Sequence, residues 1–139
     1  TGYCVQMSGG VVLWRSRKQR RVASSTTHAE YIALYECVVE LMWIKSFLSE
    51  LGQDIFVPEN CIVKCDNQGA ILIANSNTVN DRSKHFVVNY HFVREQMKLK
   101  LFKIEYVPSR ENLADILTKP LPGLQTASIV KMMGIQDQK

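Results

Sequence analysis

The stretch Cys61-Ile62-Val63-Lys64-Cys65-Asp66-Asn67-Gln68-Gly69-Ala70 decides the fold of this chain, because it passes from a strand into a helix. Residues 61–65 are mostly apolar and predict a short strand that ends at Asp66, and residues 68–75 predict a short helix. In open α/β sheets, ligands bind beyond the carboxyl ends of the strands. Asp66 is therefore placed either to hold a metal ion or to cap the helix that follows.

The part of the chain before this stretch predicts a hairpin and then a long helix. Residues 2–7 and 11–16 are rich in strand formers and flank a glycine-containing turn signal, so we expect two antiparallel strands. Thr26 or Thr27 is expected to be the N-cap of a helix that should end at Gly52, and Glu30, three residues after Thr27, matches a capping box. The apolar residues of this helix recur at steps of three and four, which predicts one apolar face: Leu34, Cys37, Leu41, Ile44, Leu48 and Leu51.

The part of the chain after this stretch adds one strand between two helices. The alternating residues 101–107 predict the strand, and helices are expected over 85–98 and 111–117. The order of elements is that of a mixed α/β fold in which helices pack on a sheet. We predict one domain over residues 1–122 and an extension with one weak helix over 123–139.

The composition fits a single globular domain. The 139 residues are 46% hydrophobic and 22% charged, which allows a packed core and argues against wholesale disorder. No apolar run reaches the roughly 20 residues that a membrane-spanning helix needs. The four cysteines form no CxxC pair and no set with zinc spacing, so we expect free thiols.

The net charge of +4 is only weak evidence for a nucleic-acid partner, but the charge is unevenly distributed. A basic run leads toward the segment that contains Glu30, and we expect it to contact phosphates, with a solvated strand end as the alternative. It consists of Arg15, Arg17, Lys18, Arg20 and Arg21. Trp14 and Trp43 are expected to lie in the core.

Three acidic residues in separate contexts predict a shared site. Glu30 falls in the first turn of the predicted helix, where the helix dipole by itself also favours an acid. Asp66 follows the central strand. Asp115 lies between Ala114 and Ile116, where burying a lone carboxylate is costly unless a cation or another partner compensates it. Several carboxylates converging in a basic protein indicate a divalent-metal site that acts on phosphodiesters.

Six short motifs occur along the chain in a fixed order. They are Arg17-Lys18-Gln19, the Ser24–Tyr31 segment, Asp66-Asn67-Gln68, Lys84-His85, the His91–Glu95 segment and the Ala114–Leu121 segment. Together they resemble the ribonuclease H domain of Ty1/copia-type retrotransposon Pol polyproteins, over about residues 1–122. The resemblance implies a ribonuclease H-like fold, a mixed sheet with flanking helices.

The same resemblance implies hydrolysis of the RNA strand of RNA–DNA hybrids during reverse transcription. Glu30, Asp66 and Asp115 would hold two Mg²⁺ ions, or Mn²⁺, which activate the attacking water and stabilise the leaving 3′ oxygen. A reverse transcriptase polymerase domain would be the partner in the parent polyprotein. Such a protein would work in cytoplasmic virus-like particles or in the nucleus.

The chain departs from the family pattern in one respect. The family's domain begins with a central strand that carries the first catalytic aspartate, whereas residues 1–29 of this chain contain no acid. We therefore expect a domain truncated at its amino end, without its central strand and impaired as an enzyme. A non-catalytic remnant that at most binds nucleic acid is the first alternative. An integrase-like strand transferase is disfavoured, because there the glutamate comes last and here it comes first.

Further residues are candidates for contacts with the hybrid. Arg82, Lys84 and His85 form a second basic spot, with a partly buried histidine at a helix start as the alternative for His85. Asn67 and Gln68 could hydrogen-bond the 2′-hydroxyl that distinguishes RNA from DNA. Capping of the helix by Asn67 is the equally open alternative.

Overall fold

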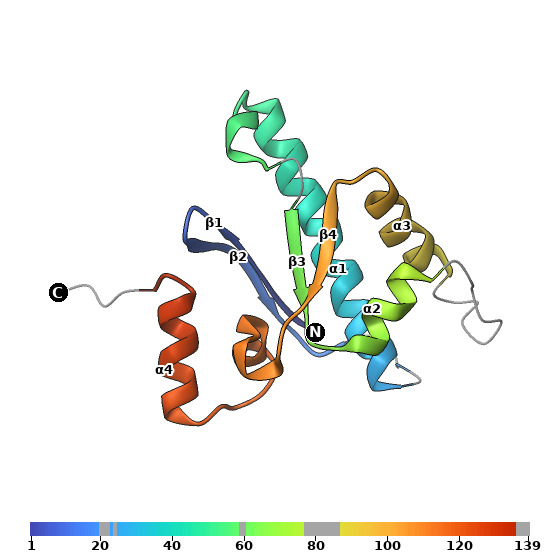
Figure 1. Cartoon of the computed structure of the whole chain (residues 1–139). Helices are drawn as coiled ribbons and strands as arrows, with labels where there is room; N and C mark the ends of the chain where they lie inside the picture. Colours follow the sequence, from blue (N-terminus) through green and yellow to red (C-terminus); the bar gives the residue numbers. More distant parts are fainter. Residues whose placement is uncertain (20–22, 24, 59–60, 77–86, 136–139) are drawn as a thin grey trace.

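The computed structural model describes residues 1–19, 23, 25–58, 61–76 and 87–135 as a mixed α/β fold (Figure 1), as predicted. The strands are β1 (Gly2–Met7), β2 (Gly10–Ser16), β3 (Cys61–Cys65) and β4 (Phe102–Tyr106). The α-helices are α1 (Thr26–Glu50), α2 (Gln68–Asn75), α3 (Val87–Lys98) and α4 (Gly123–Met132). Short 3₁₀ helices are η1 (Asp54–Phe56), η3 (Ser109–Glu111) and η4 (Leu113–Leu117). No described helix is both long and apolar enough to cross a bilayer.

The strands form two separate pairs. β1 and β2 are antiparallel, with a bulge between Val5 and Gln6, and Gly9 provides the positive φ of +85° that their tight turn requires. β3 and β4 are parallel, with Cys61 beside Phe102 and Cys65 beside Tyr106. No ladder joins the two pairs among the described residues, so β1 and β3 each pair along one edge only.

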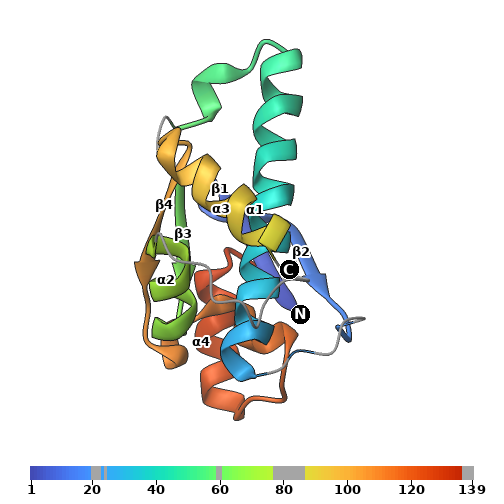
Figure 2. The same ribbon diagram turned by 90° about the vertical axis from the view of Figure 1, so that its right-hand side faces the viewer.

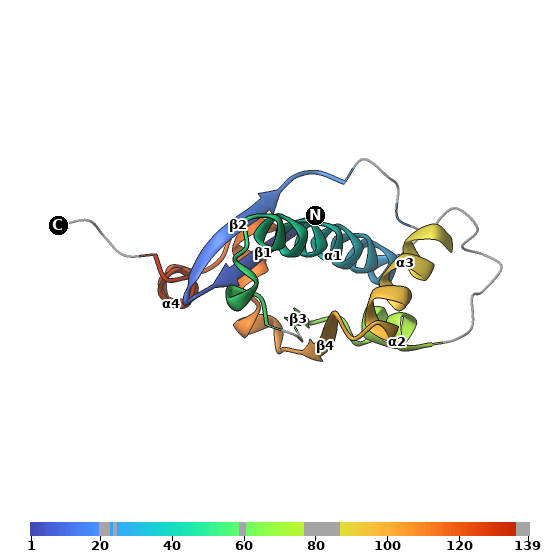
Figure 3. The same ribbon diagram turned by 90° about the horizontal axis from the view of Figure 1, so that it is seen from above.

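Helix α1 connects the two pairs by packing along one side of both. Viewed from the side (Figure 2), α1 lies beside the β3–β4 pair, with α3 packed against it. Viewed from above (Figure 3), the two strand pairs lie apart. The main core therefore forms around α1, where the largest fully buried side chains include Tyr31, Val38, Val93 and Phe102.

The start of α1 differs from the prediction. Ser25 is the N-cap, and its hydroxyl accepts a hydrogen bond from the His28 amide at 3.1 Å, so the Thr27–Glu30 capping box is wrong. Glu30 lies beyond the first turn, which contains no acid. Because the effect of the helix dipole on a side chain fades within that turn, it does not explain a glutamate here.

Three other expectations need correction. Trp14 and Trp43 are 65% and 56% exposed, so neither lies in the core. Trp14 lies on the face of β2 where Val12 and Ser16 are also exposed, and Trp43 stacks on Phe47 along the outer side of α1. Residues 111–117 form parts of two 3₁₀ helices and not one α-helix, because Asn112 caps a new turn between them. The four cysteines are free, as predicted.

Helix α4 packs against the rest of the fold, although it lies after residue 122, the predicted end of the domain. That domain boundary stays a prediction. Ile129 is fully buried, and the backbone of Met132 and Met133 accepts hydrogen bonds from the side chain of Gln6 and the amide of Val11. The carboxyl end of α4 is therefore hydrogen-bonded to both strands of the β1–β2 hairpin.

Replacing Ile129 by alanine should lower the free energy of unfolding by about 2–5 kcal/mol, because it leaves a cavity beneath α4. Leu124→Ala on the same helix is the matched control, since Leu124 is 91% exposed and its loss should cost less than about 0.5 kcal/mol. Urea unfolding of both variants measures the difference. Equal effects would mean that α4 is not anchored at Ile129.

Candidate carboxylate site

The three acids predicted to form a site come from three different elements, and Asp66 and Asp115 both lie within electrostatic reach of Glu30. Glu30 projects from α1, Asp66 follows β3, and Asp115 lies in η4. The carboxylates of Asp66 and Asp115 both repel the carboxylate of Glu30. Residues far apart in the sequence are thus brought to one end of the fold.

Two glycines allow this close approach. A Cβ atom on Gly69 would lie 2.9 Å from the side chain of Thr27, so only glycine lets α2 begin directly against the start of α1. A Cβ atom on Gly2 would collide with Thr118, where β1 begins beside η4. The first contact brings Asp66 near Glu30, and the second places η4, with Asp115, against β1.

Asp115 is 7% exposed, as its apolar sequence context suggested, and its partner is Lys119. The Lys119 ammonium lies 2.7 Å from Oδ2 of Asp115. Asn112 caps η4 through a 3.1 Å bond from the Ala114 amide, which fixes the turn that carries Asp115. Lys119 was missed in the sequence, although its i,i+4 spacing from Asp115 is the usual signal for such a pair.

Negative charge accumulates at Glu30. Desolvation of its carboxyl, followed by repulsion from Asp66 and from Asp115, raises the pKa of Glu30. Glu30 is exposed as a whole residue, and the repulsion from neighbouring carboxylates acts on it without requiring burial. Lys119 opposes the rise, which places its ammonium within electrostatic reach of the site.

The donor set fits a divalent cation by chemistry and charge. Carboxylate oxygens are the ligands that Mg²⁺ prefers, and an extra cation would relieve the repulsion at Glu30. The distances between the side chains do not fit a single ion. In the part of the chain that the structure describes, no three His, Cys, Asp or Glu residues are close enough to hold one. Lys119 already neutralises one of the three carboxylates.

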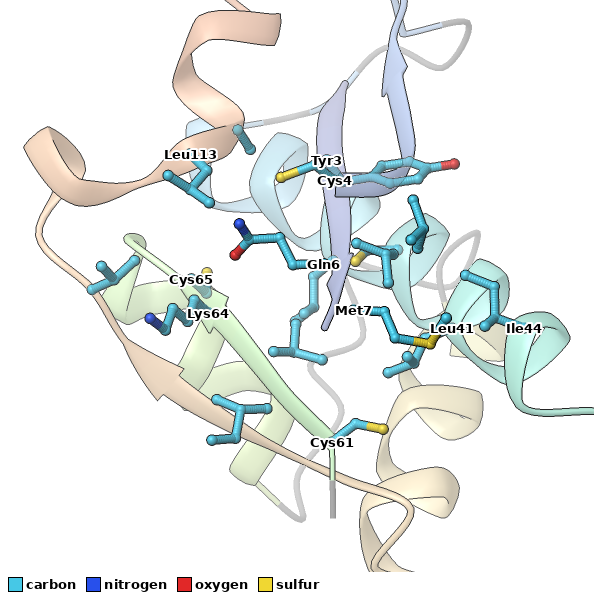
Figure 4. Close-up of a pocket in the computed structure, with 18 of the residues that line it drawn as sticks. Tyr3, Cys4, Gln6, Met7, Leu41, Ile44, Cys61, Lys64, Cys65 and Leu113 are labelled. Atoms are coloured by element: carbon cyan, nitrogen blue, oxygen red, sulfur yellow. The ribbon is translucent and has the colours of Figure 1, made fainter. Parts of the chain in front are cut away.

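An apolar cavity of about 830 Å³ opens beside the acids (Figure 4). Glu30 and Asp66 lie among its lining residues. The remainder of the lining is mainly β1, β3 and the apolar face of α1, including Leu34, Cys37, Leu41, Ile44 and Leu48. These helix residues were predicted to share a face, whereas Leu51, the last of that pattern, is 57% exposed.

Only part of the predicted nucleic-acid surface can be placed. Arg15 of β2 forms an ion pair with Glu40 of α1 at 3.4 Å, and Arg17, which directly follows β2, forms one with Glu36 of α1 at 2.6 Å. Both arginines therefore link this segment to α1. Lys18 is exposed. Five further candidates lie outside the described residues: Arg20, Arg21, Arg82, Lys84 and His85.

The residues after Asp66 have a clear structural role. The side-chain oxygen of Asn67 accepts a 2.9 Å bond from the Ala70 amide and caps α2, which is the helix-cap alternative for this residue. Gln68 is exposed at the first turn of α2. Arg94, in another of the spaced motifs, donates to the carbonyl of Ile73 at 2.8 Å and so ties α3 to α2.

Comparison with known proteins decides the origin of the chain. It is 42% identical over 122 residues to the retrovirus-related Pol polyprotein from transposon TNT 1-94 of Nicotiana tabacum, a match that covers 88% of this chain. It is 34% identical over 134 residues, or 96% of the chain, to the Pol polyproteins from transposons RE1 and RE2 of Arabidopsis thaliana. The chain is homologous to a segment of Ty1/copia-type retrotransposon Pol polyproteins.

The Pol homology covers little of those relatives. The chain spans 9% of the length of each of these three polyproteins. A more distant match, 26% identical over 117 residues, is the truncated transposon Ty1-A Gag-Pol polyprotein of Saccharomyces cerevisiae. No family model and no solved structure matches the chain. The retroelement origin is therefore established, and the activity of this Pol segment is a matter for proposal.

The substitution Glu30→Gln should stabilise the Pol segment at neutral pH. A carboxyl whose folded pKa is raised favours the fold below its unfolded pKa, near 4.5, and loses that contribution as the pH rises through the folded value. Glutamine removes the repulsion without adding charge. Thermal melts should show a higher melting temperature for Glu30→Gln at pH 7 and little difference at pH 4. A lower melting temperature at pH 7 would mean that Glu30 is not repelled by its neighbours.

Proposed function

We propose that this Pol segment is a ribonuclease H-type module that hydrolyses the RNA strand of RNA–DNA hybrids within its parent element. One observation carries the proposal. Three acids from distant motifs lie within electrostatic reach of one another, since Asp66 and Asp115 both act on Glu30, in a chain homologous to retrotransposon Pol polyproteins. Converging carboxylates at the carboxyl end of a parallel strand suit hydrolysis of phosphodiesters.

Each residue would have a distinct part. Glu30, Asp66 and Asp115 would hold Mg²⁺ or Mn²⁺, which when bound supplies an activated water and neutralises the charge that develops on the leaving oxygen. Lys119 would pair with the buried Asp115 carboxylate and orient it until a cation replaces the lysine. Asn67 holds the start of α2, and so the position of Asp66, through its cap.

The substrate would be bound through its backbone. Lys18 is exposed beside the two arginines that fasten β2 to α1, and a phosphate there would gain from the basic run. Arg20, Arg21, Arg82, Lys84 and His85 belong to the same proposal by sequence. Gln68, exposed in the first turn of α2, is the residue that we assign to the RNA 2′-hydroxyl.

The alternative is a retroelement remnant that binds nucleic acid without cleaving it. Two observations favour it. The candidate site has three carboxylates, and residues 1–29 contain no Asp or Glu. The acids in the described part of the chain are also not close enough to hold one ion. In the intact element the module would work beside a polymerase domain inside virus-like particles.

Cleavage of a labelled RNA–DNA hybrid by the purified chain, in Mg²⁺ or Mn²⁺, separates these two functions. We expect slow cleavage of the RNA strand that disappears in Asp66→Asn, because the site has its three acids but no fourth carboxylate. A folded chain that binds the hybrid without cutting it would establish the remnant. Equal cleavage by Asp66→Asn would show that the activity comes from elsewhere.

A further inference from the structure

The outer side of α1 carries a row of exposed apolar side chains that continues to its C-cap. The members recur every four residues, and we call them the α1 stripe: Val39, Trp43, Phe47 and Leu51, which are 38%, 56%, 45% and 57% exposed. The rings of Trp43 and Phe47 stack 9° from parallel, with their centroids 5.3 Å apart. Because residues four apart lie one above the other on a helix, the stripe is a continuous ridge with a flat aromatic middle.

The packing of α1 inside this fold does not account for the stripe. Leu34, Val38 and Leu41, on other sides of the helix, are already buried in the core. In the side view, the second half of α1 extends past β3 and β4 (Figure 2). A helix that is apolar all round is normally covered on every side, and an exposed apolar patch of a few hundred Å² marks an interaction surface. The stripe therefore indicates a protein partner.

Nucleic acid is a poor partner for the stripe. The charged residues three positions from its members, and so next to it on the helix surface, are all acidic: Glu36, Glu40 and Glu50. Carboxylates beside the aromatic rings would repel a phosphate backbone.

We propose that the α1 stripe joins two copies of this chain, which pair antiparallel about a two-fold axis between Trp43 and Phe47. A two-fold contact uses the same patch on both copies, so the patch must be complementary to its own reverse. Trp43 of each copy then meets Phe47 of the other, and Val39 meets Leu51. Rows of residues four apart are also the ridges by which helices commonly pack on one another.

The charges at the two ends of the stripe favour the antiparallel arrangement. At the Val39 end, Arg15 pairs with Glu40 at 3.4 Å, but its side chain is still 42% exposed and can bind a second carboxylate. At the other end Glu50 is exposed. Reversal about the axis brings Glu50 of one copy to the level of residue 40 of the other, beside Arg15. The dimer therefore gains two symmetric ion pairs, whereas a parallel arrangement would place Glu50 beside Glu50.

The size of the surface determines the expected affinity. Four partly exposed apolar side chains offer roughly 400 Å² on each copy, or about 800 Å² in a dimer. Stable interfaces bury at least about 1,200 Å². We therefore expect a reversible dimer with a dissociation constant of roughly 10–100 μM.

Sedimentation velocity of the full chain, from about 1 μM to 1 mM, tests the proposal. The buffer contains EDTA and no nucleic acid, so the result does not depend on the proposed nuclease function. Trp43→Ala should raise the dissociation constant at least about tenfold, because a tryptophan at the centre of a contact carries much of the binding energy. Trp14→Ala is the matched control, since Trp14 is 65% exposed but lies on β2, and it should leave association unchanged. Circular dichroism checks that both variants are folded.

A second pair of variants tests the charged ends. Glu50→Gln should weaken association about threefold, because an exposed ion pair contributes little but occurs twice in the dimer. Ser49→Lys changes the net charge by the same single unit, about 100° further round the helix, and should have no effect.

Four results would overturn the proposal. A chain that stays monomeric at every concentration would assign the stripe to a different partner. Assembly beyond a dimer would contradict the two-fold arrangement. Equal effects of Trp43→Ala and Trp14→Ala would place the contact elsewhere, and tighter association of Glu50→Gln would rule out the antiparallel pairing of charges.

Discussion

Joining an aspartate-bearing strand to the amino end of the chain is expected to raise both its melting temperature and its cleavage of hybrids. The new strand would enter the cavity between β1 and β3, pairing with the edges of both strands and covering the apolar residues of α1 that line the cavity. A net gain of about 2 kcal/mol would raise the melting temperature of a domain of this size by roughly 7 °C.

The start of β1 makes the direction of this strand definite. Gly2 lies against Ala114 and Leu117 of η4, which carries Asp115, so β1 starts at the acidic end of the cavity. A strand joined to Thr1 by a tight turn would run antiparallel to β1 and end beside Glu30 and Asp66. Its aspartate would add a fourth carboxylate, and we expect cleavage to rise at least about 100-fold, as when one preorganised charged group is restored to an active site.

The same extension with asparagine in place of the aspartate is the control. It should keep or exceed the gain in melting temperature, measured by calorimetry, because pairing and packing do not depend on that carboxylate and asparagine adds no repulsion at Glu30, and it should lose the gain in cleavage. An extension that changes neither would mean that the two sheets are completed in another way. If the asparagine extension raises cleavage as much as the aspartate extension, the gain comes from completing the sheet and not from a fourth carboxylate.

In the extended protein, Asp66→Asn and Asp115→Asn should each lower single-turnover cleavage by a factor of about 100 to 1,000. An amide keeps the shape of each side chain but removes the charge that would hold a cation. Binding of the hybrid, measured by fluorescence anisotropy, should be unchanged or tighter, because a negative charge beside the phosphates is lost. The effect is thus expected on the chemical step alone.

Asp54→Asn is the matched control, because Asp54 is an exposed aspartate in η1 and not one of the three candidate acids. It should change neither cleavage nor binding. Asp115→Asn also releases Lys119, but that lysine is 52% exposed and is readily solvated, so the fold should tolerate the change. Full cleavage by either site variant would remove that residue from the proposed site.

Much of the secondary structure follows from local patterns. The hairpin, the end of α1 near Gly52, the strand before Asp66 and the cap at Asn67 depend on neighbours a few residues away, and all four match the structure. The start of α1 was misassigned because Ser25 and Thr27 are both good caps, and only the backbone at Ser25, with φ −160° and ψ 165°, is extended as a cap requires. The tryptophans were misplaced because side-chain type does not reveal whether another layer covers a face.

The sequence by itself determined the mixed α/β class, the retroelement origin and the three candidate acids, because motifs and periodicities are local properties that survive without coordinates. Only the tertiary structure decided that Gly69 lets α2 approach α1, and that β1 and β3 border an apolar cavity. These features join residues tens of positions apart. They arise from which surfaces the fold covers and which backbone edges it leaves unpaired, and no local pattern encodes that.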